Sequence, residues 1–503
     1  MPKARRRALF HWSFLVALFL GAAAAAGFAP LNWWFLTLFS FAGLVALIAR
    51  APTMRRALAT GWWFGVGHFT IGLNWIATAF YYQNAMPHWL GWIAVVVLSF
   101  YLAVFPMAAV GLAWRWGRPA LFHFAFIFAA AWIFTEWLRA TLFTGFAWNP
   151  LGVMLVDVGQ AARWIGTYGL SGIIILAASA IAGFSVGKWR QSTLLLLPLL
   201  GTAALGHFLP QVPAPQPNAP LLRIVQPNIN QNQKYSELLA ERNFRRLSVL
   251  TGHQTLEPRL VLWPEAAIPY YLEEEAWARQ RLSRLLGPHD VLLTGGDALV
   301  YDKADKLVAA RNSLFALNAA GEILGRYDKS HLVPYGEYLP MRPILAAIGL
   351  SRLVPGDFDF LPGPGPQTYT LPEFGKVGIQ ICYEIIFSGQ VVDANNRPAF
   401  IFNPSNDAWF GAWGPPQHLA QARLRAIEEG LPVVRSTPTG ISAVVDADGK
   451  IISQVDWQQA GALAEKLPAA LPPTLFSRYG NKLPLSFAAV LALIAIAVRP
   501  RRR

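Results

Sequence analysis

The chain has a single cysteine, Cys382, in a setting that suits a nucleophile. It stands in GKVGIQICYEIIFSG, where 377–381 has the apolar pattern of a buried strand and Cys-Tyr-Glu follows at the expected strand end. Strand ends in open α/β sheets commonly display ligands and nucleophiles. The alternative is a small buried core residue, which is what most free cysteines are. A nucleophile would need a base and an oxyanion stabiliser from elsewhere in the chain.

Two charged residues are candidates for those roles. Glu265 in LVLWPEAAIPYY follows an apolar strand and a proline, where a carboxylate can point into a cleft and accept a thiol proton. Lys329 in GRYDKSHLVPYGEYLP follows an expected hairpin, where an ammonium can stabilise a thiolate or an oxyanion. Considered singly, each residue is equally compatible with a solvated surface position.

These residues lie in a segment with the pattern of one α/β domain, which we place at 221–470. The expected strands are LLRIVQ, RLVLWP, DVLLTGG, NSLFALN, KVGIQI, AFIFNP and LPVVRS, with helices expected at 236–251, 274–286 and 417–429. The runs 318–321 and 446–449 are expected to form hairpin turns. Proline-rich linkers at 211–220 and 471–482 mark the domain boundaries.

The rest of the chain has the composition of a membrane protein. Of 503 residues, 54% are hydrophobic and only 14% are charged. Apolar stretches of near-spanning length predict about eight transmembrane helices: seven in 1–210 and one in 483–503, which also carries a basic tail. The predicted spans are 8–26, 31–49, 57–79, 89–113, 119–138, 161–186, 193–209 and 483–498.

The formal charge of +14 is a topology signal and not the mark of a nucleic-acid-binding surface. Its excess lies in clusters between alternate spans: 3–7, 50–56, 115–118, 188–190 and 499–503. With these clusters on the cytoplasmic side, the α/β domain lies outside the cytoplasm. A cleavable signal peptide at the N-terminus is an alternative for the first span, and it would leave the sidedness of later segments unchanged.

Linked motifs in the α/β segment carry a family resemblance. They are IVQPNINQNQKY, LVLWPEAAIP, YDKSHLVPYGEYLP, GIQICYEIIF, NPSNDAWFG and QHLAQARLRAIEEGLPVVRS. In this order they resemble the Glu-Lys-Cys proteins of the nitrilase (carbon–nitrogen hydrolase) superfamily. With the membrane bundle included, essentially the full length is similar to the bacterial apolipoprotein N-acyltransferase family.

The resemblance implies an αββα sandwich with Glu265 as base, Lys329 as oxyanion stabiliser and Cys382 as nucleophile. It also implies that five residues support the site or bind substrate: Glu337, Tyr383, Glu384, Tyr235 and Trp409. Tyr235 replaces a tryptophan that is common in the family, and TPTGIS at 437–442 replaces an expected asparagine-rich turn.

The implied reaction moves an acyl chain from a membrane phospholipid to the α-amino group of the lipid-modified N-terminal cysteine of an apolipoprotein. The implied enzyme is a monomer in the bacterial inner membrane with a periplasmic catalytic domain, and it uses no cofactor, metal or nucleic acid. Two other functions remain open: a membrane-anchored amidase acting on soluble substrates, and a transporter or channel with a large exterior domain.

Three features outside the motifs have two interpretations each. Glu136 and Arg139, one helical turn apart, form either a mutually satisfied pair or a lipid-headgroup contact. The aromatic residues at 409, 410 and 413 either belong to the interfacial aromatic belt or dip into lipid near the site. The nine histidines lack metal-ligand spacing, so the sequence predicts no metal centre.

Overall fold

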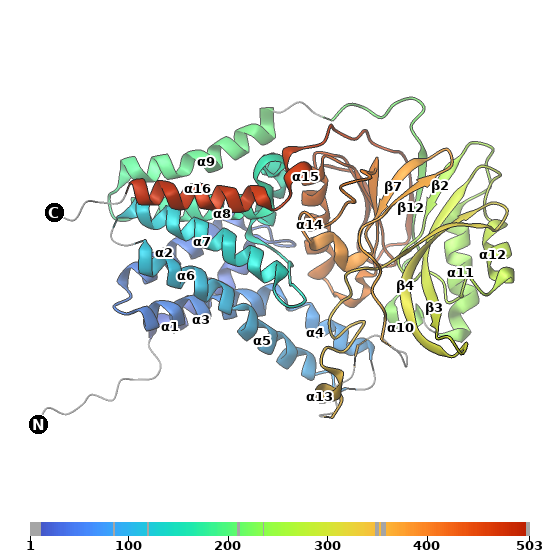
Figure 1. Cartoon of the computed structure of the whole chain (residues 1–503), viewed down its shortest axis with the longest axis horizontal. Helices are drawn as coiled ribbons and strands as arrows, with labels where there is room; N and C mark the ends of the chain where they lie inside the picture. The colour runs from blue at the N-terminus through green and yellow to red at the C-terminus, as the bar shows by residue number, and fades with distance from the viewer. Residues whose placement is uncertain are drawn as a thin grey trace, which may run out of the picture.

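A computed structural model of the chain describes residues 12–83, 86–117, 120–208, 212–234, 236–347, 352–353 and 359–498. A bundle of roughly aligned helices is followed at one end by an α/β domain (Figure 1). The final helix returns from the α/β domain to pack within the bundle, so the two ends of the described chain belong to the same part.

The bundle contains a helix in each stretch that the sequence marks as apolar. Among the described residues, four segments are long and apolar enough to cross a membrane: Leu90–Trp116, Leu121–Thr141, Leu151–Phe184 and Trp189–Phe208. Shorter apolar helices lie at Trp12–Gly27, Trp34–Arg50 and Lys482–Ala497. The bundle helices are α1 (Trp12–Ala24), α2 (Trp34–Arg50), α3 (Met54–Gly72), α4 (Ile76–Ala79), α5 (Leu90–Leu102), α6 (Val104–Trp116), α7 (Leu121–Thr141), α8 (Ala162–Phe184), α9 (Trp189–Phe208) and α16 (Lys482–Ala497). The structure therefore supports a membrane part.

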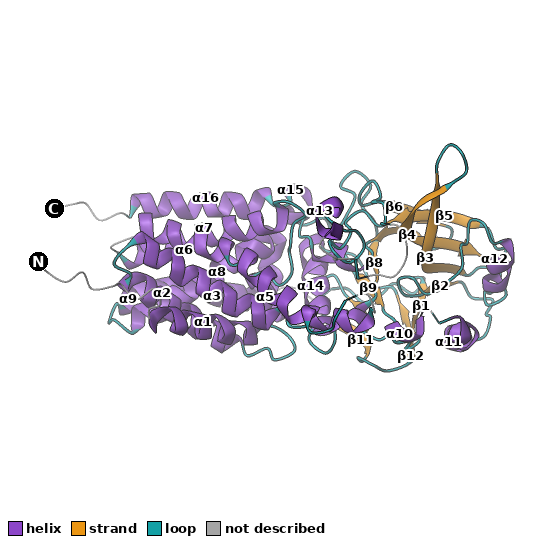
Figure 2. Ribbon diagram, turned by 90° about the horizontal axis from the view of Figure 1, so that it is seen from below, coloured by secondary structure: helices purple, strands orange, loops and turns teal. Residues whose placement is uncertain are grey.

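The α/β domain contains two six-stranded sheets packed face to face (Figure 2). The first has the order β12-β1-β2-β3-β4-β5 and the second β11-β10-β9-β8-β7-β6. The strands are β1 (Leu221–Gln226), β2 (Arg259–Leu262), β3 (Val291–Tyr301), β4 (Leu307–Asn318), β5 (Ile323–Asp328), β6 (Thr368–Leu371), β7 (Gly375–Ile379), β8 (Phe400–Pro404), β9 (Val433–Ser436), β10 (Ser442–Val445), β11 (Ile451–Val455) and β12 (Gly461–Lys466).

Alternation along the strands builds the core between the sheets. Leu222 and Ile224 of β1 share one apolar cluster with Val377 and Ile379 of β7, and all four are fully or almost fully buried. Val225, the next residue of β1, faces the opposite side and packs in the cluster that holds the helices α11 (Glu237–Thr251) and α12 (Ala276–Ser283). Helix α14 (Gly414–Glu429) covers the second sheet, which gives αββα layering as the family resemblance predicts. The shorter helices are α10 (Gln231–Lys234), α13 (Arg342–Ala347) and α15 (Leu475–Tyr479).

Both predicted hairpins are confirmed: 318–321 joins antiparallel β4 and β5, and 446–449 joins antiparallel β10 and β11. The parallel strands β1, β2, β3 and β7, β8, β9 coincide with predicted apolar runs. The two hairpin turns imply the flanking strands β5, β10 and β11, which are absent from the seven expected strands. Strands β6 and β12 were not predicted, because their half-exposed sequences lack a buried-strand pattern.

Helix α14 is shared by both parts of the molecule. Its Leu424 and Ile427 belong to a single apolar cluster that includes Val433 of the second sheet and Leu170 of α8. Glu428 accepts hydrogen bonds from the Thr167 backbone N–H at 2.7 Å and from the Thr167 hydroxyl at 2.6 Å. The second sheet is therefore fixed against the bundle through one helix.

Candidate active site

Strand ends from both sheets bring Glu265, Lys329 and Cys382 together. Glu265 follows β2, Lys329 directly follows β5, and Cys382 opens the 3₁₀ turn Cys382–Ile386 after β7. The backbone around Glu265 lies so close to β3 that a Cβ on Gly295 would sit 2.3 Å from the Ala266 nitrogen and 2.7 Å from the Glu265 Cα. Glycine at 295 is therefore needed for the approach of the Glu265 loop to the sheet.

Lys329 lies between two carboxylates. Its Nζ is 3.3 Å from Glu265 Oε1 and 2.9 Å from Glu337 Oε1. The Asn312 Nδ2 donates to the same two oxygens, at 2.7 Å and 2.9 Å. All four side chains are buried, so each charge depends on these partners for solvation.

Cys382 has a backbone conformation that few residues other than glycine adopt, with φ of 51°. The Glu265 carboxylate and the backbone N–H of Asn406 both lie close enough to the thiol to affect its ionisation. The residue is buried, with 5% of its surface exposed. A nucleophile held in a strained turn at a strand end is a recurring arrangement at functional sites.

The electrostatics fit a thiol with an ionised base beside it. Burial, with the nearby Glu265 carboxylate, raises the pKa of Cys382 well above its ordinary value despite the opposing charge of Lys329. Burial also opposes ionisation of Glu265, but the ammonium groups of Lys329 and Lys234 outweigh it and lower the pKa of Glu265. For Lys329, burial is outweighed by the carboxylates of Glu265 and Glu337, which raise its pKa. The ground state is thus a neutral thiol, a carboxylate and an ammonium.

Sequence reasoning missed several polar residues that complete this centre. Asn312 bridges the two glutamates, and Lys234 donates from Nζ to the Glu265 carbonyl oxygen at 3.1 Å. Asp297 lies in the same field of charges, and burial raises its pKa to about 6. The available signal was a polar residue beginning or interrupting an apolar strand, as Asn312 does in NSLFALN and Asp297 does in β3.

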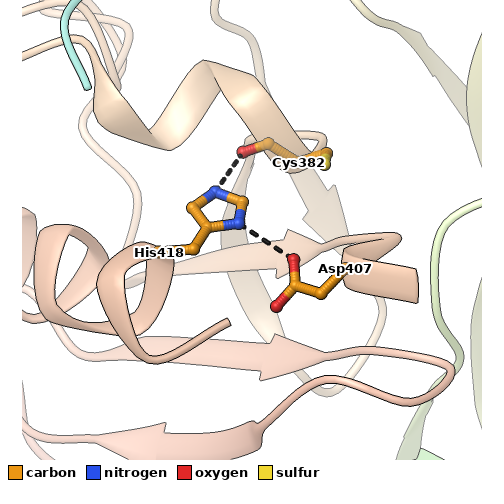
Figure 3. A group of neighbouring side chains, drawn as sticks. All are labelled: Cys382, Asp407 and His418. Atoms are coloured by element: carbon orange, nitrogen blue, oxygen red, sulfur yellow. Dashed lines mark hydrogen bonds and ion pairs between the residues drawn. The ribbon is translucent and has the colours of Figure 1, made fainter. Parts of the chain in front are cut away.

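A second buried polar group lies on the other side of Cys382 (Figure 3). His418 Nε2 is 3.1 Å from the Cys382 carbonyl oxygen, and its Nδ1 is 2.9 Å from Asp407 Oδ1. Arg435 donates from Nη2 to Asp407 Oδ2 at 2.6 Å. Potential ligand atoms of Cys382, Asp407 and His418 lie within 4.8 Å of one another, as in some metal sites. Both imidazole nitrogens already have partners, so the geometry is that of a hydrogen-bonded network.

Comparison with known proteins agrees with this architecture. Residues 222–471 match the carbon–nitrogen hydrolase family model, and residues 20–180 match that of the apolipoprotein N-acyltransferase N-terminal domain. Apolipoprotein N-acyltransferases from Rhodopseudomonas palustris and Bradyrhizobium diazoefficiens are 34% and 35% identical to the chain, and each alignment covers 97% of it and 95% of the relative. The relative from Caulobacter vibrioides is 34% identical over 96% of this chain and 94% of its own.

The chain belongs to the apolipoprotein N-acyltransferase family. The match spans the bundle and the α/β domain together, so the family resemblance inferred from the linked motifs is confirmed.

The other site residues predicted from the family take different positions. Glu384 ties the Cys382 turn to the Lys329 loop, since it accepts from the Ile381 backbone N–H at 2.6 Å and from the Ser330 N–H at 2.7 Å. The Tyr383 hydroxyl instead faces the bundle and donates to the Gly145 carbonyl oxygen at 3.4 Å. Trp409 is partly exposed, with its ring edge-on to Tyr82 at 5.8 Å between centroids. Tyr235 lies outside the described residues.

In this family member the bundle and the catalytic domain meet through a loop after α7. Glu136 accepts from the Leu151 N–H at 2.8 Å, and Arg139 donates to the Trp148 carbonyl oxygen at 2.8 Å. Both side chains are buried, which favours the interpretation as a mutually satisfied pair holding this loop. Phe410 packs on the rings of Trp75 and Trp148, with centroids 4.6 Å and 5.5 Å away. These contacts place Phe410 against aromatic residues of the bundle.

Proposed function

We propose that the chain transfers an acyl chain from a membrane phospholipid to the α-amino group of the lipid-modified N-terminal cysteine of apolipoproteins, through a thioester on Cys382. The observation that carries the proposal is the convergence of Glu265, Lys329 and Cys382 beside the membrane bundle. The names of the relatives, which match over nearly the whole chain, support the same activity.

In the first half-reaction, Glu265 removes the thiol proton as the Cys382 sulfur attacks the ester carbonyl carbon of the phospholipid. The negative charge that develops on the carbonyl oxygen is stabilised by the Lys329 ammonium and by the backbone N–H of Tyr383. When the C–O bond breaks, Glu265 returns the proton to the leaving lysophospholipid. The raised pKa of Lys329 supports this role because the ammonium keeps its charge throughout.

In the second half-reaction, the α-amino group of the apolipoprotein attacks the thioester carbonyl carbon. Glu265 accepts a proton from the amine, the C–S bond breaks, and the Cys382 thiolate is reprotonated. The product is an amide. Glu337, Asn312 and Glu384 support the site by holding Lys329 and the Cys382 turn in register. Exclusion of water protects the thioester, and the burial of Cys382 favours that exclusion.

We further propose about eight transmembrane spans, with the catalytic domain on the periplasmic side of the bacterial inner membrane. The N-terminal end of α8 meets the catalytic domain at Thr167, so Lys188 after its other end lies at the remote face of the bundle. Arg115, at the end of α6, lies near the start of α7, whose other end holds Trp148. Basic residues at the face remote from the catalytic domain support a cytoplasmic position for that face.

All proposed site residues come from one chain, which supports a monomeric enzyme. We also propose that 211–220 and 471–482 are the linkers between the domains, because each joins a bundle helix to the α/β domain.

Mass spectrometry of the purified enzyme after incubation with phospholipid vesicles tests the function. We expect an acyl adduct on Cys382 in the wild type, none in Cys382→Ala, and strongly slowed formation in Glu265→Ala and Lys329→Ala. Adding a diacylglyceryl-modified peptide with a free α-amino group should discharge the adduct and acylate the peptide. A wild type that forms no adduct from phospholipid but hydrolyses soluble amides would instead support the amidase alternative.

A further inference from the structure

His418 is a fully buried histidine that contacts the backbone of the proposed nucleophile (Figure 3). A carbonyl oxygen only accepts hydrogen bonds, so the Nε2 that lies 3.1 Å from the Cys382 oxygen carries hydrogen in either charge state of the ring. The Asn403 Nδ2 also donates to this oxygen, at 3.4 Å, and to the Gln380 oxygen at 2.6 Å. Two donors therefore hold one carbonyl group.

The His418 ring is also held on its Nδ1 side. With the hydrogen on Nε2, Nδ1 of the neutral ring accepts from Arg435 Nη2 at 3.0 Å. Arg435 is held in turn by Asp407, to which it donates and whose Oδ1 lies 2.9 Å from Nδ1. Arg435 also donates to Asn403, so both donors to the Cys382 carbonyl belong to one network. Asp407, His418 and Arg435 are each at most 1% exposed, so water does not compete for the hydrogen bonds of this network.

Holding this carbonyl determines the direction of the next N–H. The Cys382 C=O and the Tyr383 N–H belong to one planar peptide group, in which they point in opposite directions. Cys382 has a φ of 51°, a conformation that is unfavourable for a residue with a Cβ and that persists only when surrounding contacts enforce it. A carbonyl held on the His418 side therefore directs the N–H toward the opposite side.

We propose that His418, held by Arg435 and Asp407, is a positioning residue that fixes the Cys382–Tyr383 peptide group so that its N–H remains directed at the reacting oxyanion. This inference rests on the proposed acyl transfer, in which that N–H stabilises the tetrahedral intermediate. His418 acts through the backbone and leaves proton transfer to Glu265.

The bundle contributes to this arrangement through Trp148. Its indole ring lies 5.2 Å from the His418 ring between centroids, and its Nε1 donates to Gln417 Oε1 at 2.8 Å. The Trp148 carbonyl oxygen is held in turn by Arg139 of α7 at 2.8 Å. The membrane part thus packs directly on the residue that orients the nucleophile's backbone.

A matched pair of variants tests the proposal. In His418→Gln the terminal NH₂ reaches about as far as Nε2, whereas in His418→Asn it reaches only as far as Nδ1. We expect acyl-adduct formation on Cys382 from phospholipid vesicles to slow about 10²–10³-fold in His418→Asn, as for loss of an oxyanion donor, and to recover to within about tenfold of wild type in His418→Gln.

Alkylation of Cys382 by iodoacetamide separates positioning from activation of the thiol. It forms no tetrahedral oxyanion, so we expect its rate to change less than about threefold in both variants. Equal acylation rates in the two variants, or alkylation that falls in parallel with acylation, would overturn the proposal.

Asp407→Asn decides the question if His418→Asn does not fold. This variant keeps the volume and weakens the support of the ring, so acylation should slow while alkylation stays near the wild-type rate. Unchanged acylation in Asp407→Asn would also overturn the proposal. Failure of the wild type to form an adduct would refute the acyl-transfer function itself, which makes the two failures distinguishable.

Discussion

Lys329, Glu265 and Glu337 form a buried group of one ammonium and two carboxylates beside a thiol. Burying an isolated charge is costly, but each of these charges has an opposite partner within 3.3 Å and shares Asn312 as a polar contact. Because the partners stabilise the charged forms, Glu265 and Lys329, the proposed base and oxyanion stabiliser, stay ionised without solvent. The proposed acyl transfer can therefore take place in a site that excludes water.

The pKa shifts of Glu265 and Lys329 predict how the rate of acylation depends on pH. The pKa of Glu265 is lowered and that of Lys329 is raised, so neither residue changes charge between about pH 5 and pH 9. We expect the rate of acyl-adduct formation to show no loss from either residue across this range. Single-turnover mass spectrometry at fixed vesicle composition measures it.

Asp297 provides the control for that profile. Its pKa is raised to about 6 by burial, so a shallow inflection near pH 6 that disappears in Asp297→Asn belongs to Asp297. An acid limb near pH 6 that persists in this variant would contradict the lowered pKa of Glu265.

Glu429 predicts a pH dependence of stability. Burial, with the adjacent Glu428 carboxylate, raises the pKa of Glu429 to about 8 from an ordinary value of 4.5. Between these two values the folded protein holds a proton that the unfolded chain releases, so stability falls as the pH rises. In Glu429→Gln this loss is removed. We expect the thermal midpoint of the variant, relative to wild type, to rise between pH 4.5 and pH 8 and to level off above.

The exposed Glu257 serves as the comparison for Glu429. Glu257→Gln should leave the thermal midpoint close to wild type at every pH. A Glu429→Gln midpoint that runs parallel to wild type from pH 5 to pH 8.5 would show that Glu429 is ionised in the folded protein.

At the scale of elements, the adjacent glycines Gly295 and Gly296 of β3 differ in how close an added Cβ would come to its neighbours. A Cβ on Gly295 would meet backbone atoms of 265 and 266 at 2.3–2.8 Å, whereas the nearest atoms to a Cβ on Gly296 lie 3.6 Å away in side chains. Because these contacts are with backbone atoms, a Cβ at 295 would displace the backbone at 265 and 266 and move the Glu265 side chain with it.

We therefore expect Gly295→Ala to slow acyl-adduct formation about 10²-fold, the effect of a misplacement of roughly 1 Å at a catalytic group. Gly296→Ala should stay within about threefold of wild type, because its contacts are ordinary van der Waals distances. Adduct rates and thermal midpoints of both proteins provide the measurement. Equal rates in the two variants would mean that the Glu265 loop is not constrained by β3.

The strands of the two sheets were only partly predictable from the sequence. Parallel strands β1, β2, β7 and β8 are continuous apolar runs because both faces of their sheets are covered, and such runs are evident in the sequence. Edge strands β11 and β12 are half-exposed, and their polar sequences take strand form only through pairing with a neighbour.

At the scale of the whole molecule, the sidedness of the catalytic domain can be measured with single cysteines. Cys382 is the only native cysteine, so Cys382→Ala gives a background without thiols. Lys303, exposed between β3 and β4, and Lys188, exposed between α8 and α9, belong to the two opposite ends of the molecule.

In intact spheroplasts, a membrane-impermeant maleimide should label Lys303→Cys and leave Lys188→Cys unlabelled until the cells are lysed. The reason is that basic residues between spans remain cytoplasmic, and Lys188 belongs to such a cluster. Labelling of Lys188→Cys alone in intact spheroplasts would reverse the proposed topology.

The sequence by itself determined the membrane and α/β parts, most of the buried strands, and the three residues whose types allow acyl transfer. Length and hydrophobic pattern are local properties, so these features can be inferred without knowledge of packing. Only the tertiary structure decided which polar residues surround the thiol. Asn312, Lys234 and the Asp407–His418 pair lie 70 to 148 or 25 to 36 positions from Cys382 along the chain. They converge around it because β4, α10, α14 and the turn after β8 all pack against the strand ends that carry Glu265 and Cys382. Their charges and hydrogen bonds act on one another only because the fold buries them together in one water-poor site.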